Sequence, residues 1–85
     1  MVYSVELRPS ARRELLKLPQ RDRVRLIRAM DSLSHTPRPP GVKKLIGLEN
    51  LYRIRVGDYR VVYQIQDDRL VVLVVRIGHR KDVYR

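Results

Sequence analysis

The spacing of apolar residues near the N-terminus predicts a strand followed by a helix. Residues 2–7 alternate, with Tyr3, Val5 and Leu7 on one side, and this period of two is typical of a half-buried strand. Pro9 interrupts the strand, and Ser10 is expected to cap a helix over ARRELLKL. The apolar residues of that helix share one stripe: Ala11, Leu15 and Leu18, with Leu16 beside it.

A second helix is predicted after Pro19, which suits a junction between two helices. Its apolar residues recur at helical spacing and are expected to face the core: Val24, Ile27, Met30 and Leu33, flanked by Leu26. Four arginines fall largely on the other side: Arg21, Arg23, Arg25 and Arg28. The two helices are predicted to form a hairpin, with an exposed apolar fringe around Leu16, Leu26 and Met30.

The pattern changes after the segment HTPRPPG (residues 35–41), which its prolines exclude from a helix. LYRIRV, YRVVYQIQ and RLVVLVVRI then read as strands, separated by Gly57-Asp58 and Asp67-Asp68. The third of these is apolar on both faces, so it is expected to be central and covered, at least in part, on both sides. The order β-α-α-β-β-β predicts one α+β domain over residues 1–85, with a helical hairpin on one face of a mainly antiparallel sheet.

The Gly57-Asp58 turn sets a register that groups three arginines. A two-residue loop pairs Arg55 with Arg60 and places Arg53 opposite Val62. Alternation then sends these arginines to one face, and the opposite face, toward the helices, receives the other side chains: Ile54, Val56, Tyr59, Val61 and Tyr63. The cluster is either a group of solvated arginines or a site that holds a phosphate.

Charge favours an anionic partner. The chain carries 19 Lys and Arg against 9 Asp and Glu, a formal net charge of +10. Such an excess indicates nucleic acid, an acidic protein, or both. All five aromatic residues are tyrosines, which can stack on a base and keep a polar tip.

Several other classes of protein are disfavoured by composition. There are no cysteines, and His35 and His79 lie far apart, so neither a disulfide framework nor a metal site or other cofactor is expected. No apolar run approaches the roughly 20 residues of a membrane span, and the N-terminus shows no signal peptide. A cytoplasmic location without membrane contact is expected.

The segment after the third of these strands adds candidate chemistry. It offers His79, Arg80, Lys81 and Tyr84 near the end of the sheet. RNA cleavage needs a base for the 2′-OH, cations for the charged transition state and an acid for the leaving 5′-oxygen. These side chains could supply the groups that the reaction needs. Taken alone, a single His is more often structural or exposed, and a C-terminal Tyr more often packs against the core.

The second half of the chain, KKLIGLENLYRIRVGDYRVVYQIQDDRLVVLVVRIGHRKDVY, resembles toxins of the RelE family. The likeness lies in the pattern KL-x-G-x-x-x-x-Y-[RK]-I-[RK]-x-G-x-YR-[LIV]-x-Y, followed by V-G-[HK]-R and a terminal V-Y. The resemblance implies a ribosome-dependent endonuclease that cuts mRNA in the A site of the 70S ribosome. It also implies a cognate antitoxin protein that inhibits the enzyme, and contact with DNA only through the antitoxin complex.

The same resemblance assigns roles to residues. Arg53 and Arg55 match the family's paired basic residues, and Arg60 matches its phosphate-binding arginine. Arg80 matches a proposed acid or transition-state contact, and Tyr84 a tyrosine that stacks on a base or handles a proton. Further RNA contacts are expected from basic residues around this cluster: Lys43, Lys44, Arg76 and Lys81.

One departure from the family concerns the general base. Some members carry lysines where this chain has Arg53 and Arg55, and an arginine is effectively never deprotonated in a protein. These two residues should act as fixed charges. His79, Tyr84 or a group supplied by rRNA remain as candidates for the base, and His79 has the most suitable unperturbed pKa.

Two other functions remain open at this point. ParE-like relatives share the fold but inhibit DNA gyrase without cutting RNA, and they generally lack the complete set of Arg53, Arg55, Arg60, Arg80 and Tyr84. The third interpretation is a basic module that binds nucleic acid without catalysis. A fold by itself does not specify a function, so the choice rests on the site residues. The complete set favours the nuclease.

Overall fold

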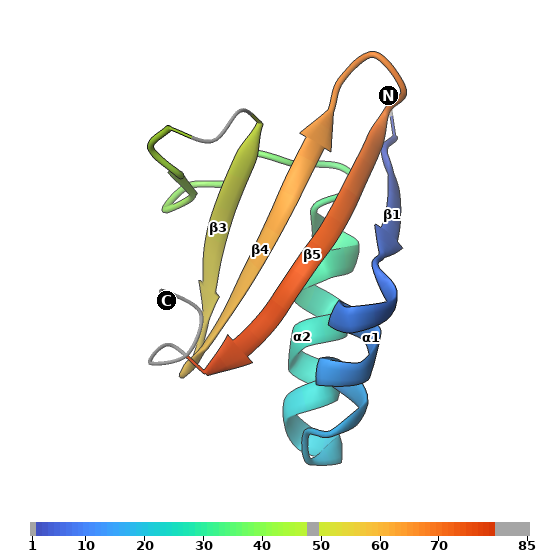
Figure 1. Ribbon diagram of the computed structural model, residues 1–85, viewed down its shortest axis with the longest axis vertical. Helices are drawn as coiled ribbons and strands as arrows, with labels where there is room; N and C mark the ends of the chain where they lie inside the picture. Colours follow the sequence, from blue (N-terminus) through green and yellow to red (C-terminus); the bar gives the residue numbers. More distant parts are fainter. Residues whose placement is uncertain (1, 48–49, 80–85) are drawn as a thin grey trace.

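The computed structural model describes residues 2–47 and 50–79, which form two helices packed on a five-stranded sheet (Figure 1). The elements in chain order are β1 (Ser4–Leu7), α1 (Pro9–Leu16), α2 (Gln20–Ser32), β2 (Lys43–Lys44), β3 (Leu51–Val56), β4 (Tyr59–Gln66) and β5 (Val71–His79). The strand order is β1-β5-β4-β3-β2, with β1 parallel to β5 and the other neighbours antiparallel. The predicted α+β fold, with a helical hairpin on a mainly antiparallel sheet, is confirmed.

Two elements begin at residues other than those expected. Helix α1 begins at Pro9, and no side chain caps it, so the expected cap by Ser10 is wrong. Proline is well suited to the first turn, where its missing N–H would have no intrahelical partner. Strand β5 begins at Val71 rather than Arg69, because residues 67–70 form the preceding turn and Leu70 has a φ of 53°.

The buried face of α2 also differs from the prediction. Leu26, Met30 and Leu33 are in the core, while Val24 and Ile27 are 41% and 43% exposed. At 3.6 residues per turn, a series spaced by three drifts round the helix by about 180° between residues 24 and 33. Residues 26, 30 and 33 are separated by four and three positions, so their side chains stay on one face of the helix. Of the expected apolar fringe only Leu16, which is 60% exposed, lies at the surface.

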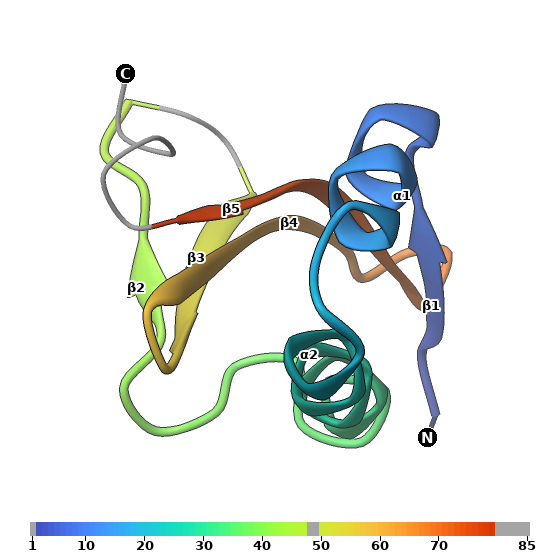
Figure 2. The same ribbon diagram turned by 90° about the horizontal axis from the view of Figure 1, so that it is seen from below.

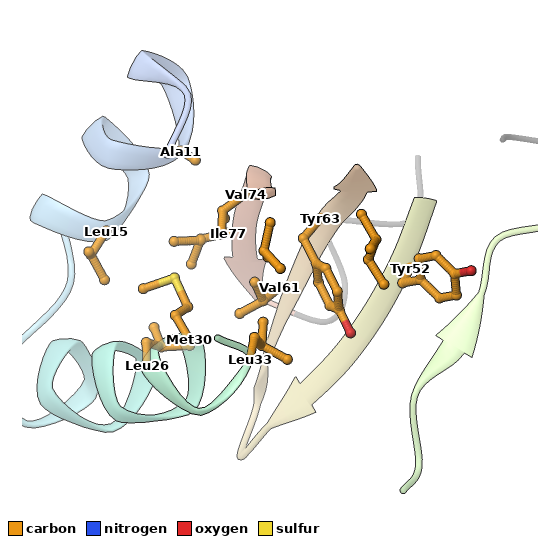
Figure 3. Close-up of a cluster of buried hydrophobic side chains, with 12 residues drawn as sticks. Ala11, Leu15, Leu26, Met30, Leu33, Tyr52, Val61, Tyr63, Val74 and Ile77 are labelled. Atoms are coloured by element: carbon orange, nitrogen blue, oxygen red, sulfur yellow. The ribbon is translucent and has the colours of Figure 1, made fainter. Parts of the chain in front are cut away.

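The core lies between the helices and one face of the sheet (Figure 3). Ala11 and Leu15 of α1, two residues of α2 and Leu33 directly after it pack against residues of the central strands: Val61, Tyr63, Ile65, Val72, Val74 and Ile77. Strand β5 lies between β1 and β4, so its central position is confirmed. In the described part of the chain both helices pack on the same face (Figure 2), so neither of them covers the second face of β5.

The loop that leads from α2 to β2 is fastened to the far end of the sheet. The Tyr63 hydroxyl donates a hydrogen bond to the Pro37 carbonyl at 2.7 Å. Arg38 forms an ion pair with Asp67 at 2.9 Å, and the Tyr3 hydroxyl donates to the same carboxylate at 2.6 Å. The hydrogen bonds from Arg38 and then Tyr3 lower the pKa of Asp67 below its usual value. This network fixes the start of the segment that carries β2.

Candidate nucleic-acid interface

The β3–β4 hairpin has the register that the sequence predicts. Val56 pairs with Tyr59, Arg55 with Arg60, and Arg53 with Val62. Gly57 has a φ of 60°, whereas Asp58 is not among the residues with positive φ. This combination is the turn with glycine first, in which the left-handed conformation is needed at one position only.

Arg53, Arg55 and Arg60 lie together on the face of the sheet that points away from the helices. On β4, Tyr59, Val61 and Tyr63 pack against the core. Because side chains alternate along a strand, Arg60 and its partner Arg55 point to the opposite face, as does Arg53 two residues from Arg55. Arg53 and Arg60 are half-buried, while Arg55 is exposed and its Nε donates to the Gly57 carbonyl at 3.2 Å. The predicted grouping of the three arginines is confirmed.

Strand β2, which the sequence pattern did not predict, brings another cation to this face. Lys43 pairs with Arg53, so the two side chains project from the same side of the sheet. Lys44 pairs with Tyr52 and lies on the other side. A strand of two residues leaves too few alternating positions for a periodicity signal, and its register comes only from pairing with β3.

A bulge in the β4–β5 pair places a further arginine. Tyr63 pairs with Val74 but Val62 pairs with Arg76, so one extra residue, Val75, is inserted into β5. Regular pairing would set Arg76 opposite Val61, over the core. With the bulge, Arg76 shares the face of Val62. Lys43, Arg53, Arg55, Arg60 and Arg76 are called the basic face below.

Arg60 has an arginine on one side of it on this face and a glycine on the other. Its partner on β3 is Arg55 and its partner on β5 is Gly78, which has no side chain. Two guanidiniums directly opposite each other repel, and an anion between or beside them relieves that repulsion. An arrangement of this kind has the charge and the donors to accept a phosphate group.

His79 does not join the basic face. It pairs with Tyr59, and the two rings meet edge to face with centroids 6.1 Å apart. Tyr59 belongs to the helix side of the sheet, where its hydroxyl donates to Asp22 of α2 at 3.1 Å. Burial and, second, the hydrogen bond to Asp22 raise the pKa of Tyr59. The structure therefore separates His79 from the arginines with which the sequence analysis grouped it.

Three other predicted site residues, Arg80, Lys81 and Tyr84, lie outside the described residues. Among residues 2–47 and 50–79, no three side chains of the metal-binding types form a group that could hold an ion. No helix within these residues is long and apolar enough to cross a membrane.

Comparison with known proteins identifies the family. Residues 5–84 match the family model described as the ParE toxin of the type II toxin-antitoxin system parDE. Toxin RelG of Mycobacterium tuberculosis is 36% identical over 86 residues, an alignment that covers 100% of this chain and 99% of the relative. The chain belongs to the RelE/ParE family of toxins.

Two further relatives place the toxin with RelE in particular. The mRNA interferase toxin RelE of Escherichia coli is 31% identical over 83 residues, covering 95% of this chain and 86% of the relative. The archaeal RelE of Pyrococcus horikoshii, solved in a RelE–RelB complex, superposes with a TM-score of 0.84 at 31% identity. That superposition covers 96% of this toxin and 99% of the archaeal chain. The chain is thus a RelE-type toxin of a toxin–antitoxin system.

Proposed function

We propose that this toxin is an endoribonuclease that enters the ribosomal A site and cuts mRNA there. The observation that carries the proposal is the basic face, where cations from β2, β3, β4 and β5 share one side of the sheet. A relative of similar length is named an mRNA interferase, which agrees with RNA as the substrate. In the proposed reaction the 2′-OH attacks the adjacent phosphorus and the 5′-oxygen of the next nucleotide leaves.

Arg60 is the residue we assign to the scissile phosphate. It is half-buried, and its cross-strand partner on β5 is Gly78, which has no side chain. A guanidinium held in this way can donate two hydrogen bonds to the oxygens that gain charge in the transition state. Arg80 is proposed to share this task, and Arg53 and Arg55 to hold flanking phosphates as fixed charges. Lys43, Arg76 and Lys81 are proposed to bind RNA further from the reacting bond, whereas Lys44 lies on the opposite side of β2 and is not assigned this role.

The proton from the 2′-OH needs an acceptor other than the arginines. His79 lies on the helix side of the sheet, which weakens its case. Tyr84 and a group of the ribosomal RNA remain, and Tyr84 is also proposed to stack on a base. Because the nucleophile belongs to the RNA itself, the proposed reaction includes no metal-bound water and no cofactor.

A cognate antitoxin is the proposed inhibitor. The archaeal relative was solved with RelB, and the charge of +10 on this toxin suits an acidic partner. Contact with DNA is proposed to occur only through the toxin–antitoxin complex. The proposed site of action is the cytoplasm, where the ribosome is found.

The test is single-turnover cleavage of mRNA on programmed ribosomes, mapped by primer extension. We expect cuts within the A-site codon and much slower cleavage of the same RNA without ribosomes, because the open basic face relies on the ribosome to orient the mRNA. Arg60→Ala should lose this activity. Arg21→Ala, which removes an exposed charge on α2, is the matched control and should keep it. Equal rates on free and ribosome-bound RNA would refute ribosome dependence.

Gyrase inhibition is the alternative that the name of the matching family model brings forward. It is tested by DNA supercoiling with purified gyrase and the same toxin preparation. Inhibition of supercoiling together with intact mRNA on ribosomes would replace the nuclease by this function. Binding of RNA with neither activity would leave a non-catalytic nucleic-acid-binding module.

A further inference from the structure

Strand β5 has β1 as a neighbour along only part of its length. The parallel pairing covers Val71 to Val74, and the hydrogen bond from the Arg8 amide to the Val74 carbonyl, at 2.9 Å, follows it. The chain then turns into α1. Among the described residues, the last part of β5, from the bulge to His79, is therefore paired with β4 on one side and has no strand on the other.

Glu14 of α1 takes the place of the missing strand. Its Oε1 accepts a hydrogen bond from the backbone N–H of Ile77 at 3.0 Å. Its Oε2 lies 3.5 Å from the guanidinium of Arg76. One carboxylate thus holds both the backbone and a side chain of β5 just after the bulge, and it is itself only partly exposed.

The position of this contact matters because of what β5 carries. Beyond the bulge, Ile77 enters the core, Arg76 joins the basic face and Gly78 lies beside Arg60. A slip back to regular pairing would exchange the faces of Ile77 and Arg76. An anchor at Ile77 therefore sets where Arg76 and Gly78 lie relative to Arg60.

We propose that Glu14 is a positioning residue for RNA cleavage. It does not touch RNA. It holds the end of β5 in the bulged register through the hydrogen bond to Ile77, so that Arg76 and Gly78 are aligned with Arg60. This inference rests on the proposed nuclease function.

Three substitutions separate the hydrogen bond from the charge. Glu14→Gln keeps an oxygen for the Ile77 N–H but removes the negative charge from Arg76, whereas Glu14→Ala removes both. Glu6→Ala is the matched control, because Glu6 is an exposed carboxylate on β1 and its loss changes the net charge equally. Thermal melts of all variants show whether each is folded.

Cleavage is measured on programmed ribosomes over a range of toxin concentrations. We expect Glu14→Ala to lower the saturating rate about tenfold, because small misplacement of positioned groups costs rate steeply. The toxin concentration for half-saturation should change little. Glu14→Gln should recover most of the rate, and Glu6→Ala should match the wild type. Amide hydrogen exchange at Ile77 should be fast in Glu14→Ala and slow in Glu14→Gln.

The outcomes divide clearly. An unchanged saturating rate in Glu14→Ala, with an active wild type, overturns the proposal. A rate in Glu14→Gln as low as in Glu14→Ala, with Ile77 still protected, overturns it too, because charge rather than alignment would then matter. An inactive wild type on ribosomes would instead refute the nuclease function, and the role of Glu14 in it would fall with that function.

Discussion

At the scale of the residue, arginines on one side of a sheet provide charge without a proton acceptor. A guanidinium keeps its proton in a protein, so Arg53, Arg55 and Arg60 stabilise phosphate only by electrostatics and hydrogen bonds. The burial of Arg60, greater than that of Arg55, makes its hydrogen bonds to an anion stronger than the same contacts in open water.

Arg60→Ala should therefore reduce the single-turnover rate about 10²- to 10³-fold, which corresponds to about 2.7–4 kcal/mol of transition-state stabilisation. Arg60→Lys should restore part of this, because the charge remains and the two-pronged donor geometry is lost. Arg80→Ala is expected to behave like Arg60→Ala. Full activity in both alanine variants, measured on programmed ribosomes, would end the assignment of these roles.

Tyr84 and His79 are separated by a second set of substitutions. If Tyr84 stacks on a base, Tyr84→Phe should be nearly normal and Tyr84→Ala severely impaired, whereas loss of a proton-transferring hydroxyl makes the two equally poor. His79→Gln should retain its rate and pH profile, because His79 lies beside Tyr59 on the helix side. Disappearance of the acidic limb of the pH–rate profile in His79→Gln would identify it as the base after all.

At the scale of the element, the core-facing stripe of α2 follows a spacing of four and three residues. Leu26 is fully buried, while its chain neighbour Ile27 is 43% exposed. Leu26→Ala should cost about 2–5 kcal/mol of unfolding free energy, since it leaves a cavity in the core. Ile27→Ala should stay within about 1 kcal/mol, as exposed substitutions usually do. Urea unfolding of the two variants measures both, and equal losses would contradict the helix orientation described above.

The loop between α2 and β2 depends on a carboxylate whose pKa is lowered. Hydrogen bonds from Arg38 and Tyr3 favour the ionised form of Asp67 in the folded toxin. This contribution to stability is present above the usual Asp pKa of 3.8 and is lost as the pH falls through the lower folded-state value. We expect the stability advantage of the wild type over Asp67→Asn to shrink between neutral pH and pH values below 3.8.

Urea unfolding at several pH values checks this expectation. Asp68→Asn, in the same turn, is the control and should show no such change, because no contact of its carboxylate with Arg38 or Tyr3 occurs in the described network. A constant difference between wild type and Asp67→Asn across this range would show that Arg38 and Tyr3 do not hold the charge of Asp67.

At the scale of the whole molecule, the distribution of cations matters more than their number. The net charge of +10 attracts any polyanion, but only cations on the side that meets RNA release counterions on binding. Lys43 and Lys44 are neighbours in sequence on opposite sides of β2, which makes them a matched pair. Their comparison tests which side of the sheet faces the nucleic acid.

Lys43→Ala should reduce the slope of log affinity against log salt by about one, and Lys44→Ala should change it less. The measurement is binding of each variant to programmed ribosomes at several salt concentrations. Equal slopes for the two variants would mean that the basic face is not the side that meets the RNA. Binding that does not depend on salt would exclude an electrostatic contribution altogether.

The sequence by itself determined the features that depend on local periodicity and on turn chemistry. Alternation marked the strands, prolines marked the loop, and the Gly57-Asp58 turn set the register that groups Arg53, Arg55 and Arg60. A two-residue hairpin has one favoured pairing, so local residues suffice to predict it. The resemblance in the second half of the chain indicated the family that the comparisons confirm.

Only the tertiary structure decided the features that depend on contacts between distant segments. The bulge in β5, the addition of Lys43 through β2 and the capping of Ile77 by Glu14 all rest on pairings that no local pattern encodes. The placement of His79 follows from the bulge, since one inserted residue reverses the faces of every side chain beyond it. Local sequence determines that side chains alternate between the two faces of a strand. Pairing and packing between distant elements decide where a bulge shifts that alternation.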